Sequence, residues 1–76
     1  ICHSLWLFCA DPELLRGRKV TCAHNIVCDV VNAGGELVVD KGETVETHAD
    51  GLLITGRHPG AVDAFNDLFL KTIQSI

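Results

Sequence analysis

The chain has 76 residues, of which 47% are hydrophobic, and its formal net charge is -4. Its six basic residues are spread along the sequence instead of forming a patch, which argues against a nucleic-acid partner. The longest apolar stretch, Leu5 to Ala10, is far shorter than the roughly 20 residues that span a bilayer, so no membrane partner is expected. A chain of this length is at most one small domain, and its hydrophobic content indicates apolar faces that another segment or subunit covers.

The first half of the chain is predicted to contain two helices and a strand. A helix is expected over 4–10, and Pro12 then suits the start of a short second turn at 13–15. After a loop at 17–19, residues 19–23 are predicted to form a strand. A helix from about His24 carries apolar residues at helical spacing and ends at the Gly34–Gly35 pair, where glycine can take the left-handed conformation.

The second half is predicted to contain short strands and a closing helix. Strands are expected at 37–39 and 44–47, and Asp50–Gly51 marks a turn, with His48 at its solvated tip, before a buried strand at 52–55. Glu43 and Glu46 are expected on an exposed strand face. The last helix is predicted to start at Pro59, and its apolar residues recur every three or four positions along one stripe that faces a sheet: Val62, Phe65, Phe69, Ile73 and Ile76.

This alternation of strands and helices predicts an α/β fold with a largely parallel sheet. A parallel sheet must be covered on both faces, and two or three strands cannot form one alone. The pattern therefore resembles the C-terminal half of a doubly wound α/β/α domain. We expect the isolated 76 residues not to fold by themselves, because their helices would expose the stripes that face the sheet.

The four cysteines lack the loop-rich surroundings of a disulfide scaffold, which favours reduced thiols and a cytoplasmic location. Three residues, Cys22, His24 and Cys28, are candidate metal ligands by their residue types. However, zinc sites prefer closely spaced cysteine pairs and four ligands, so neither a metal nor a cofactor is expected. Cys9 is predicted to be a core residue, and Trp6 and Phe8 are predicted to serve packing.

The opening stretch ICHSLWLF carries the main candidate for chemistry. A thiol at the junction of a strand and a helix lies near the partial positive charge and unpaired N–H groups of the helix start, which favour the thiolate. A sharp turn there also presents the side chain to the crevice in which α/β domains bind ligands. The alternative is that Cys2 is only a small buried hydrophobe near a frayed end.

Four segments in this order, I-C-H at a helix start, L-x-G-R-K-V-T, N-A-G-G-E and G-L-L-I-T-G-R-H-P-G before an amphipathic helix, resemble the ThiJ/PfpI family. This family includes PfpI-type intracellular cysteine peptidases and the parkinsonism-associated deglycase, within the class I glutamine amidotransferase-like superfamily. The resemblance implies a flavodoxin-like sandwich of about twice this length or more. Residues 1–76 would be the C-terminal part of one such domain, beginning at its nucleophile elbow, with the preceding strand upstream.

The resemblance also implies roles for individual residues. Cys2 matches the family nucleophile, and His3 matches the histidine that follows it in PfpI-type members. The backbone N–H of His3 would then be one oxyanion donor. The acidic partner of the cysteine, a glutamate from an early loop in the family, has no counterpart in these 76 residues.

Four further residues are candidates to line the site. Ser4 replaces the usual glycine after Cys-His, where its hydroxyl either caps the helix or narrows the pocket. His24 lies one position after the place of a histidine in some relatives, and is otherwise a cap or a surface residue. Arg57 and His58 match the loop before the last helix, which lies near the site or the subunit contact in the family, and His58 replaces a glycine there.

The function expected from this resemblance is that of a cofactor-independent cysteine enzyme. The Cys2 thiolate would attack reactive aldehydes such as methylglyoxal, as in glyoxalase or deglycase chemistry. A PfpI-type peptidase, in which His3 protonates the leaving amine, is the closest alternative, and a non-enzymatic oxidation sensor or stress chaperone is another. The expected partners are the N-terminal half of the domain, a second copy in a homo-oligomer, and a small electrophilic carbonyl or peptide substrate.

Overall fold

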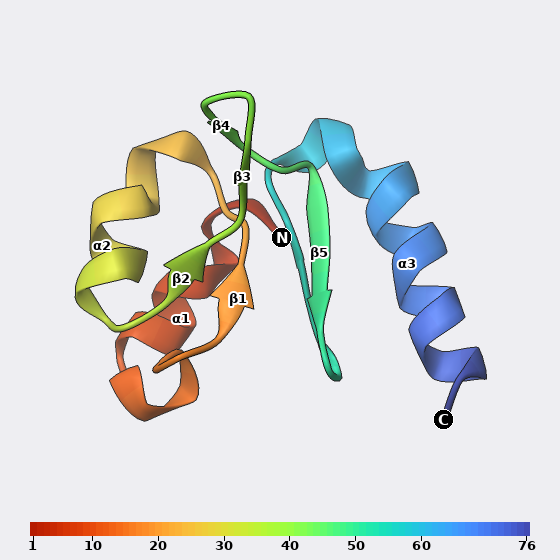
Figure 1. The fold of residues 1–76 in the computed structure, drawn as a ribbon, viewed down its shortest axis with the longest axis horizontal. Helices are drawn as coiled ribbons and strands as arrows, with labels where there is room; N and C mark the ends of the chain where they lie inside the picture. Colours follow the sequence, from red (N-terminus) through yellow and green to blue (C-terminus); the bar gives the residue numbers. More distant parts are fainter.

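The computed structural model describes residues 1–76. Its helical segments, in which η marks a 3-10 turn, are η1 (Cys2–Leu5), α1 (Trp6–Cys9), η2 (Pro12–Leu14), η3 (His24–Ile26), α2 (Val27–Asn32), η4 (Pro59–Ala61) and α3 (Val62–Gln74). Its strands are β1 (Lys19–Val20), β2 (Glu36–Leu37), β3 (Val39–Asp40), β4 (Glu43–Thr44), β5 (Thr47–Asp50) and β6 (Leu53–Gly56). Helices α1 and α2 lie on one side of the strands and α3 lies on the other (Figure 1).

The strands form three pairs, and this confirms the predicted α/β class in its general form. Strands β1 and β2 pair in parallel, with Lys19 opposite Glu36. Strands β3 and β4 form one antiparallel hairpin, and β5 and β6 form another. The predicted largely parallel sheet is therefore not confirmed: only β1 and β2 pair in parallel, while short turns impose antiparallel pairing in the second half of the chain.

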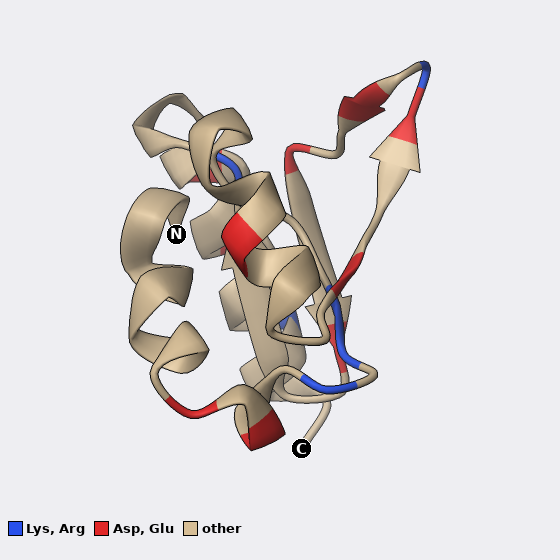
Figure 2. Cartoon of the chain, turned by 90° about the vertical axis from the view of Figure 1, so that its left-hand side faces the viewer, with Lys and Arg blue, Asp and Glu red and all other residues tan.

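The β3–β4 hairpin turns on two residues with positive φ, Lys41 at 53° and Gly42 at 83°. Positive φ at both central positions is the requirement of a type I′ turn, whose twist matches that of the paired strands. Asp40 and Glu43 face each other across this turn, and Figure 2 shows the basic tip of the hairpin flanked by acidic residues.

The predicted strand at 44–47 is wrong in its bounds, since β4 ends at Thr44 and β5 begins at Thr47. The prediction that His48 lies at a hairpin tip is also wrong. His48 is within β5 and pairs with Thr55, because the turn needs only the two residues Gly51 and Leu52. Gly51 takes a φ of 62°, so β5 continues up to Asp50.

The core lies between the first helices and β1. Its buried residues are Leu5, Leu15, Val20, Cys22, Ala23, Ile26 and Val30. Phe8 and Cys9 are partly buried and pack against this cluster, as predicted. Trp6, also predicted to pack, remains 50% exposed.

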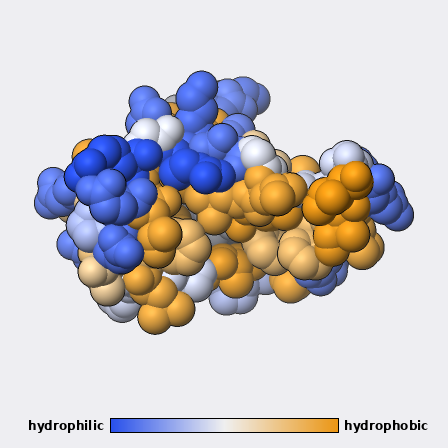
Figure 3. Space-filling model, turned by 90° about the horizontal axis from the view of Figure 1, so that it is seen from below, coloured by the Kyte–Doolittle hydropathy of each residue, from blue (hydrophilic) through white to orange (hydrophobic).

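Helix α3 packs against β5 and β6, but much of its predicted stripe stays exposed. A Cβ on Gly56 would lie 3.1 Å from Phe65 Cδ2, so the absence of a side chain at position 56 lets α3 approach β6 closely. Phe69 and Ile73, by contrast, are 45% and 48% exposed. Seen from below, apolar side chains extend over much of the surface (Figure 3). Such a surface is typical of a chain that packs against further protein.

Candidate functional site

The backbone of Cys2 has a φ of 59°, in the left-handed region. Lys41 is the other non-glycine residue with positive φ, and its value is explained by the type I′ turn. Cys2 lies in no hairpin; it begins η1, which continues directly into α1. Backbone strain of this kind costs on the order of 1–3 kcal/mol and clusters at functional sites. The conformation of Cys2 therefore makes it a candidate site residue by geometry as well as by chemistry.

The side chain of Cys2 contacts that of its neighbour. Cys2 Sγ lies 3.0 Å from His3 Nδ1, and both residues are partly buried. An imidazole at this distance can take a thiol proton and then pair with the thiolate. The indole of Trp6 lies beside the His3 ring, with 5.0 Å between ring centroids and 61° between planes.

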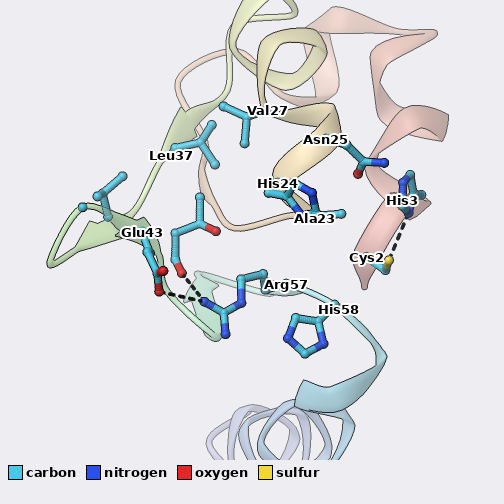
Figure 4. A pocket seen from close by; sticks show the side chains of 13 residues that line it. Cys2, His3, Ala23, His24, Asn25, Val27, Leu37, Glu43, Arg57 and His58 are labelled. Carbon is cyan, nitrogen blue, oxygen red and sulfur yellow. Dashed lines mark hydrogen bonds and ion pairs between the residues drawn. The ribbon is translucent and has the colours of Figure 1, made fainter.

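Cys2 and His3 open onto a pocket of about 720 Å³. Cys2 and His3 form one side of it, Glu43 lies on the opposite side, and His24, Arg57 and His58 lie between them (Figure 4). The lining is brought together from η1, the start of η3, strands β2 to β4 and the loop after β6. The Ala23 N–H donates to the Cys2 carbonyl at 3.3 Å, which joins the end of the β1 segment to the turn.

The structure places five of the six predicted site residues around this pocket: Cys2, His3, His24, Arg57 and His58. Ser4 does not line it. Its side chain is exposed, and its hydroxyl accepts a hydrogen bond from the Ile1 nitrogen at 2.5 Å. Of the two roles considered for Ser4, local capping of the turn matches this geometry and narrowing of the pocket does not.

Arg57 is anchored by three neighbouring groups. Its backbone N–H donates to the Glu46 carbonyl at 2.9 Å, and its Nη1 donates to the Thr44 carbonyl at 3.1 Å. The Glu43 carboxylate is 3.8 Å from Nη1, and the Glu43 side chain is 82% exposed, so this ion pair is weak. The buried Nε atom has no hydrogen-bond partner. Arg57 thus holds the loop after β6 against β4 and leaves a cationic group at the pocket.

His58 caps the last helical segment. Its Nδ1 accepts a hydrogen bond from the Gly60 N–H at 2.9 Å, and Pro59 follows at the first helical position. This contact satisfies one of the backbone N–H groups that a helix start leaves without a partner. The histidine that replaces the family's glycine therefore has a structural task at the edge of the pocket.

Eight of the thirteen residues that line the pocket were not predicted as site residues, and the polar ones among them are Asn25, Glu43 and Thr44. Glu43 was assigned to an exposed face, and the structure confirms its exposure while placing it at the pocket rim. The available signal was the Lys41–Gly42 pair, which marks a two-residue hairpin and hence places Glu43 directly across from Asp40. Nothing in the sequence pattern indicates that this hairpin folds toward the cysteine.

The remaining cysteines lie in different environments, and all four are free thiols. Cys22 is buried in the core, and burial, followed by the nearby Cys9 and Cys2 thiols, raises its pKa to about 11. Burial also raises the pKa of Cys9, with a further contribution from Asp29. Cys28 is exposed. The residues weighed as metal ligands are thus spread over the core, the pocket and the surface.

A strained cysteine beside a histidine at the start of a helix, in a small α/β fold, is typical of the cysteine nucleophile turn of α/β enzymes. Residues 1–72 match the DJ-1/PfpI family. The chain belongs to this family, which confirms the resemblance found in the sequence.

Individual relatives match over nearly the whole chain. Protein/nucleic acid deglycase 2 of Escherichia coli K12 is 38% identical over 78 residues, which cover 96% of this chain and 40% of that protein. The uncharacterized protein SAV1875 of Staphylococcus aureus Mu50 is 34% identical over 74 residues, covering 97% of this chain and 40% of that protein. The chain thus spans about two fifths of the length of these relatives. None of its helices combines the length and apolar character needed to traverse a bilayer.

Proposed function

We propose that Cys2 is the nucleophile of a cofactor-independent enzyme that acts on reactive aldehydes such as methylglyoxal. The observation that carries this proposal is the left-handed backbone of Cys2, which holds its thiol 3.0 Å from His3 Nδ1 at the mouth of a pocket. The name of the E. coli relative, a protein/nucleic acid deglycase, supports carbonyl chemistry. The family membership supports a cysteine enzyme.

The first step is addition of the thiol to the aldehyde. His3 takes the proton of Cys2, the C–S bond forms, and the electron pair of the C=O bond moves to oxygen, which takes a proton back from the imidazolium. The backbone N–H of His3, the residue after the nucleophile, is the proposed oxyanion donor. The product of this step is a hemithioacetal.

The second stage converts this hemithioacetal of methylglyoxal into a hydroxy acid. A proton leaves the former aldehyde carbon and one is added to the neighbouring ketone carbon, while the hydroxyl on the first carbon loses its proton and the former ketone oxygen gains one, which gives a thioester of lactate. Water then cleaves the C–S bond, releasing lactate and the free thiol. The overall reaction adds one water to methylglyoxal. The base for the proton transfer is expected in the part of the family domain outside these 76 residues.

The test is loss of methylglyoxal in the complete protein, followed for wild type, Cys2→Ala and Cys28→Ala. Removing a nucleophile typically costs roughly a thousandfold or more in turnover. We expect such a loss for Cys2→Ala and none for Cys28→Ala, because Cys28 is exposed and does not line the pocket. Unchanged turnover in Cys2→Ala would defeat the assignment.

A peptidase is the second candidate, and the contact between Cys2 and His3 favours it. The same imidazole that takes the thiol proton can protonate the leaving amine of a cleaved peptide. Release of small fragments from an unfolded protein substrate, lost in Cys2→Ala, would support the peptidase. Peroxide sensitivity of Cys2 without turnover of either substrate would instead indicate an oxidation sensor.

We infer further that the complete domain is a flavodoxin-like sandwich that forms a homo-oligomer in the cytoplasm. The exposed apolar side chains of α1 and α3, among them Leu7 at 77% and Leu70 at 55%, support cover by the rest of the domain and by a second copy. The four free thiols support a reducing compartment. Sedimentation of the complete protein at several concentrations tests the oligomer.

A further inference from the structure

We propose that Trp6 is a positioning residue for His3 and that Asp29 in turn holds Trp6. A chain of contacts from Asp29 through Trp6 and His3 would then orient the imidazole toward the thiol of Cys2. This inference rests on the proposed role of Cys2 as nucleophile. It assigns a task to an indole whose N–H reaches across to a carboxylate of a second helix.

Three contacts link Asp29 to Cys2 through Trp6 and His3. The Trp6 indole Nε1–H donates to Asp29 Oδ2 at 2.8 Å, although the two residues are 23 positions apart and belong to α1 and α2. The Trp6 and His3 ring centroids are 5.0 Å apart at 61°, within the range of an edge-to-face aromatic pair. His3 Nδ1 is 3.0 Å from Cys2 Sγ.

The local backbone explains why these residues meet. His3 and Trp6 are three positions apart in continuous helical structure, so they lie on the same face. The hydrogen bond to Asp29 fixes the rotation of the indole, and the indole then occupies space into which the imidazole would otherwise turn. Without Trp6, the His3 ring is free to rotate away from the thiol, and the fraction of molecules with the Cys2–His3 contact falls.

The other charged and titratable groups at the pocket come from different elements. His24 comes from η3, Glu43 from β4, and Arg57 and His58 from the loop after β6. These groups also influence the Cys2 thiolate, so the test must change Trp6 and Asp29 while leaving them in place. A substitution at an exposed position of α2 provides the matched control, and Cys28, which neighbours Asp29 and does not line the pocket, serves this purpose.

The experiment measures the rate of alkylation of Cys2 by iodoacetamide in the complete protein, with site-resolved mass spectrometry to separate it from the other three thiols. The rate is recorded over the range in which His and Cys titrate, about pH 5 to 9. The variants are Trp6→Leu, Trp6→Phe, Asp29→Ala, Asp29→Asn and Cys28→Ala. Thermal unfolding of each variant shows that the measurement is made on folded protein.

Trp6→Leu is expected to slow Cys2 alkylation at neutral pH by roughly three- to tenfold, the factor to which loss of one aromatic pair corresponds. The dependence of its alkylation rate on pH should also differ from that of wild type, because the imidazole contacts the thiol in fewer molecules. Trp6→Phe keeps an aromatic ring beside His3 but loses the N–H that Asp29 holds, so its rate should lie between those of wild type and Trp6→Leu, close to that of Asp29→Ala. Asp29→Asn keeps an acceptor for the indole N–H, so its rate of Cys2 alkylation should exceed that of Asp29→Ala.

A folded Trp6→Leu protein whose alkylation profile coincides with those of wild type and Cys28→Ala would overturn the inference. A merely structural role for Trp6 would lower the unfolding temperature without moving the profile of Cys2. The proposed function fails by a different result, namely unchanged methylglyoxal loss in Cys2→Ala, so the two failures are distinguishable.

Discussion

The hydroxyl of Thr55 accepts a hydrogen bond from the backbone N–H of Thr21 at 2.9 Å. Thr55 belongs to β6, while Thr21 directly follows β1, so this bond joins two different strand pairs. Thr21 adds a second link by donating through its own hydroxyl to the Val45 carbonyl. Both threonines are buried. These links hold the segment that leads to His24 beside the hairpin that leads to Arg57, and so bring two walls of the pocket together.

Replacing Thr55 by Val should destabilise the complete protein more than replacing it by Ser. Val has the same shape but leaves the buried Thr21 N–H without an acceptor, which costs about 1–3 kcal/mol. Ser keeps the hydroxyl and loses only one methyl group, about 1 kcal/mol. Denaturant unfolding of the two variants measures the difference, and equal stabilities would show that the hydrogen bond is dispensable.

The backbone strain at Cys2 predicts an unusual order of stability among its substitutions. Cys2→Gly should be more stable than Cys2→Ala by about 1 kcal/mol, because only the Cβ of alanine opposes the left-handed conformation. At Cys9, within the α-helix, the same pair should show the opposite order, with alanine more stable by about 1 kcal/mol. Thermal or denaturant unfolding gives both differences, and the same sign at the two positions would refute the assigned conformation of Cys2.

The hydrogen bonds of the Asp50 carboxylate lead us to expect that the folded protein loses stability in acid. The Lys19 backbone N–H donates to Asp50 Oδ2 at 2.8 Å and Arg18 Nε donates to the same oxygen at 3.0 Å, and these bonds lower the pKa of Asp50 below its ordinary value of 3.8. A lowered pKa in the folded state stabilises the protein above 3.8, and this contribution is lost as the pH falls through the folded value. The difference in the free energy of unfolding between wild type and Asp50→Asn should therefore narrow as the pH falls below 3.8. Denaturant unfolding measured at a series of acid pH values gives this difference. A difference that stays constant there would contradict the prediction.

The burial of the Cys22 thiol leads us to expect that the folded protein loses stability in alkali. Its pKa rises from 9.0 to about 11 because the buried thiol resists ionisation. A raised pKa in the folded state stabilises the protein fully below 9.0, and the contribution disappears as the pH rises toward 11. Unfolding measured across this range should show a slope in wild type that is absent in Cys22→Ala. Cys28→Ala, which keeps the buried thiol, should retain the slope.

The parts of the fold that could be predicted are those specified by local pattern. Apolar residues at helical spacing indicated the helix that became η3 and α2, and glycine at position 34, with a φ of 99°, terminates it as expected. The failures lie in the strands. The segment 44–47 has a strand-like alternation, but Val45 donates to Val38 at 3.0 Å beside the first hairpin and Glu46 accepts from Arg57 beside the second, so the segment is divided between two strand pairs.

The candidate site could be assembled from the sequence only as far as chemistry and resemblance reach. A cysteine beside a histidine suggested Cys2 and His3, and the motif before the last helix suggested Arg57 and His58. Ser4 was a candidate because it replaces the usual glycine after Cys-His, but its side chain is exposed and lies outside the pocket. Glu43 was missed because its approach to Arg57 depends on where the hairpin folds, which is a long-range property that no periodicity records.

The left-handed conformation at Cys2 also restricts which reactive groups this turn accepts. Threonine branches at Cβ, and β-branched side chains clash with such a backbone, so a hydroxyl nucleophile of that type is sterically barred. Serine and aspartate are unbranched there, and Asp is among the residues that enter this region of φ most readily. The backbone conformation at position 2 therefore limits which nucleophilic residues can replace Cys2 in a protein with this fold, whatever their pKa or substrate.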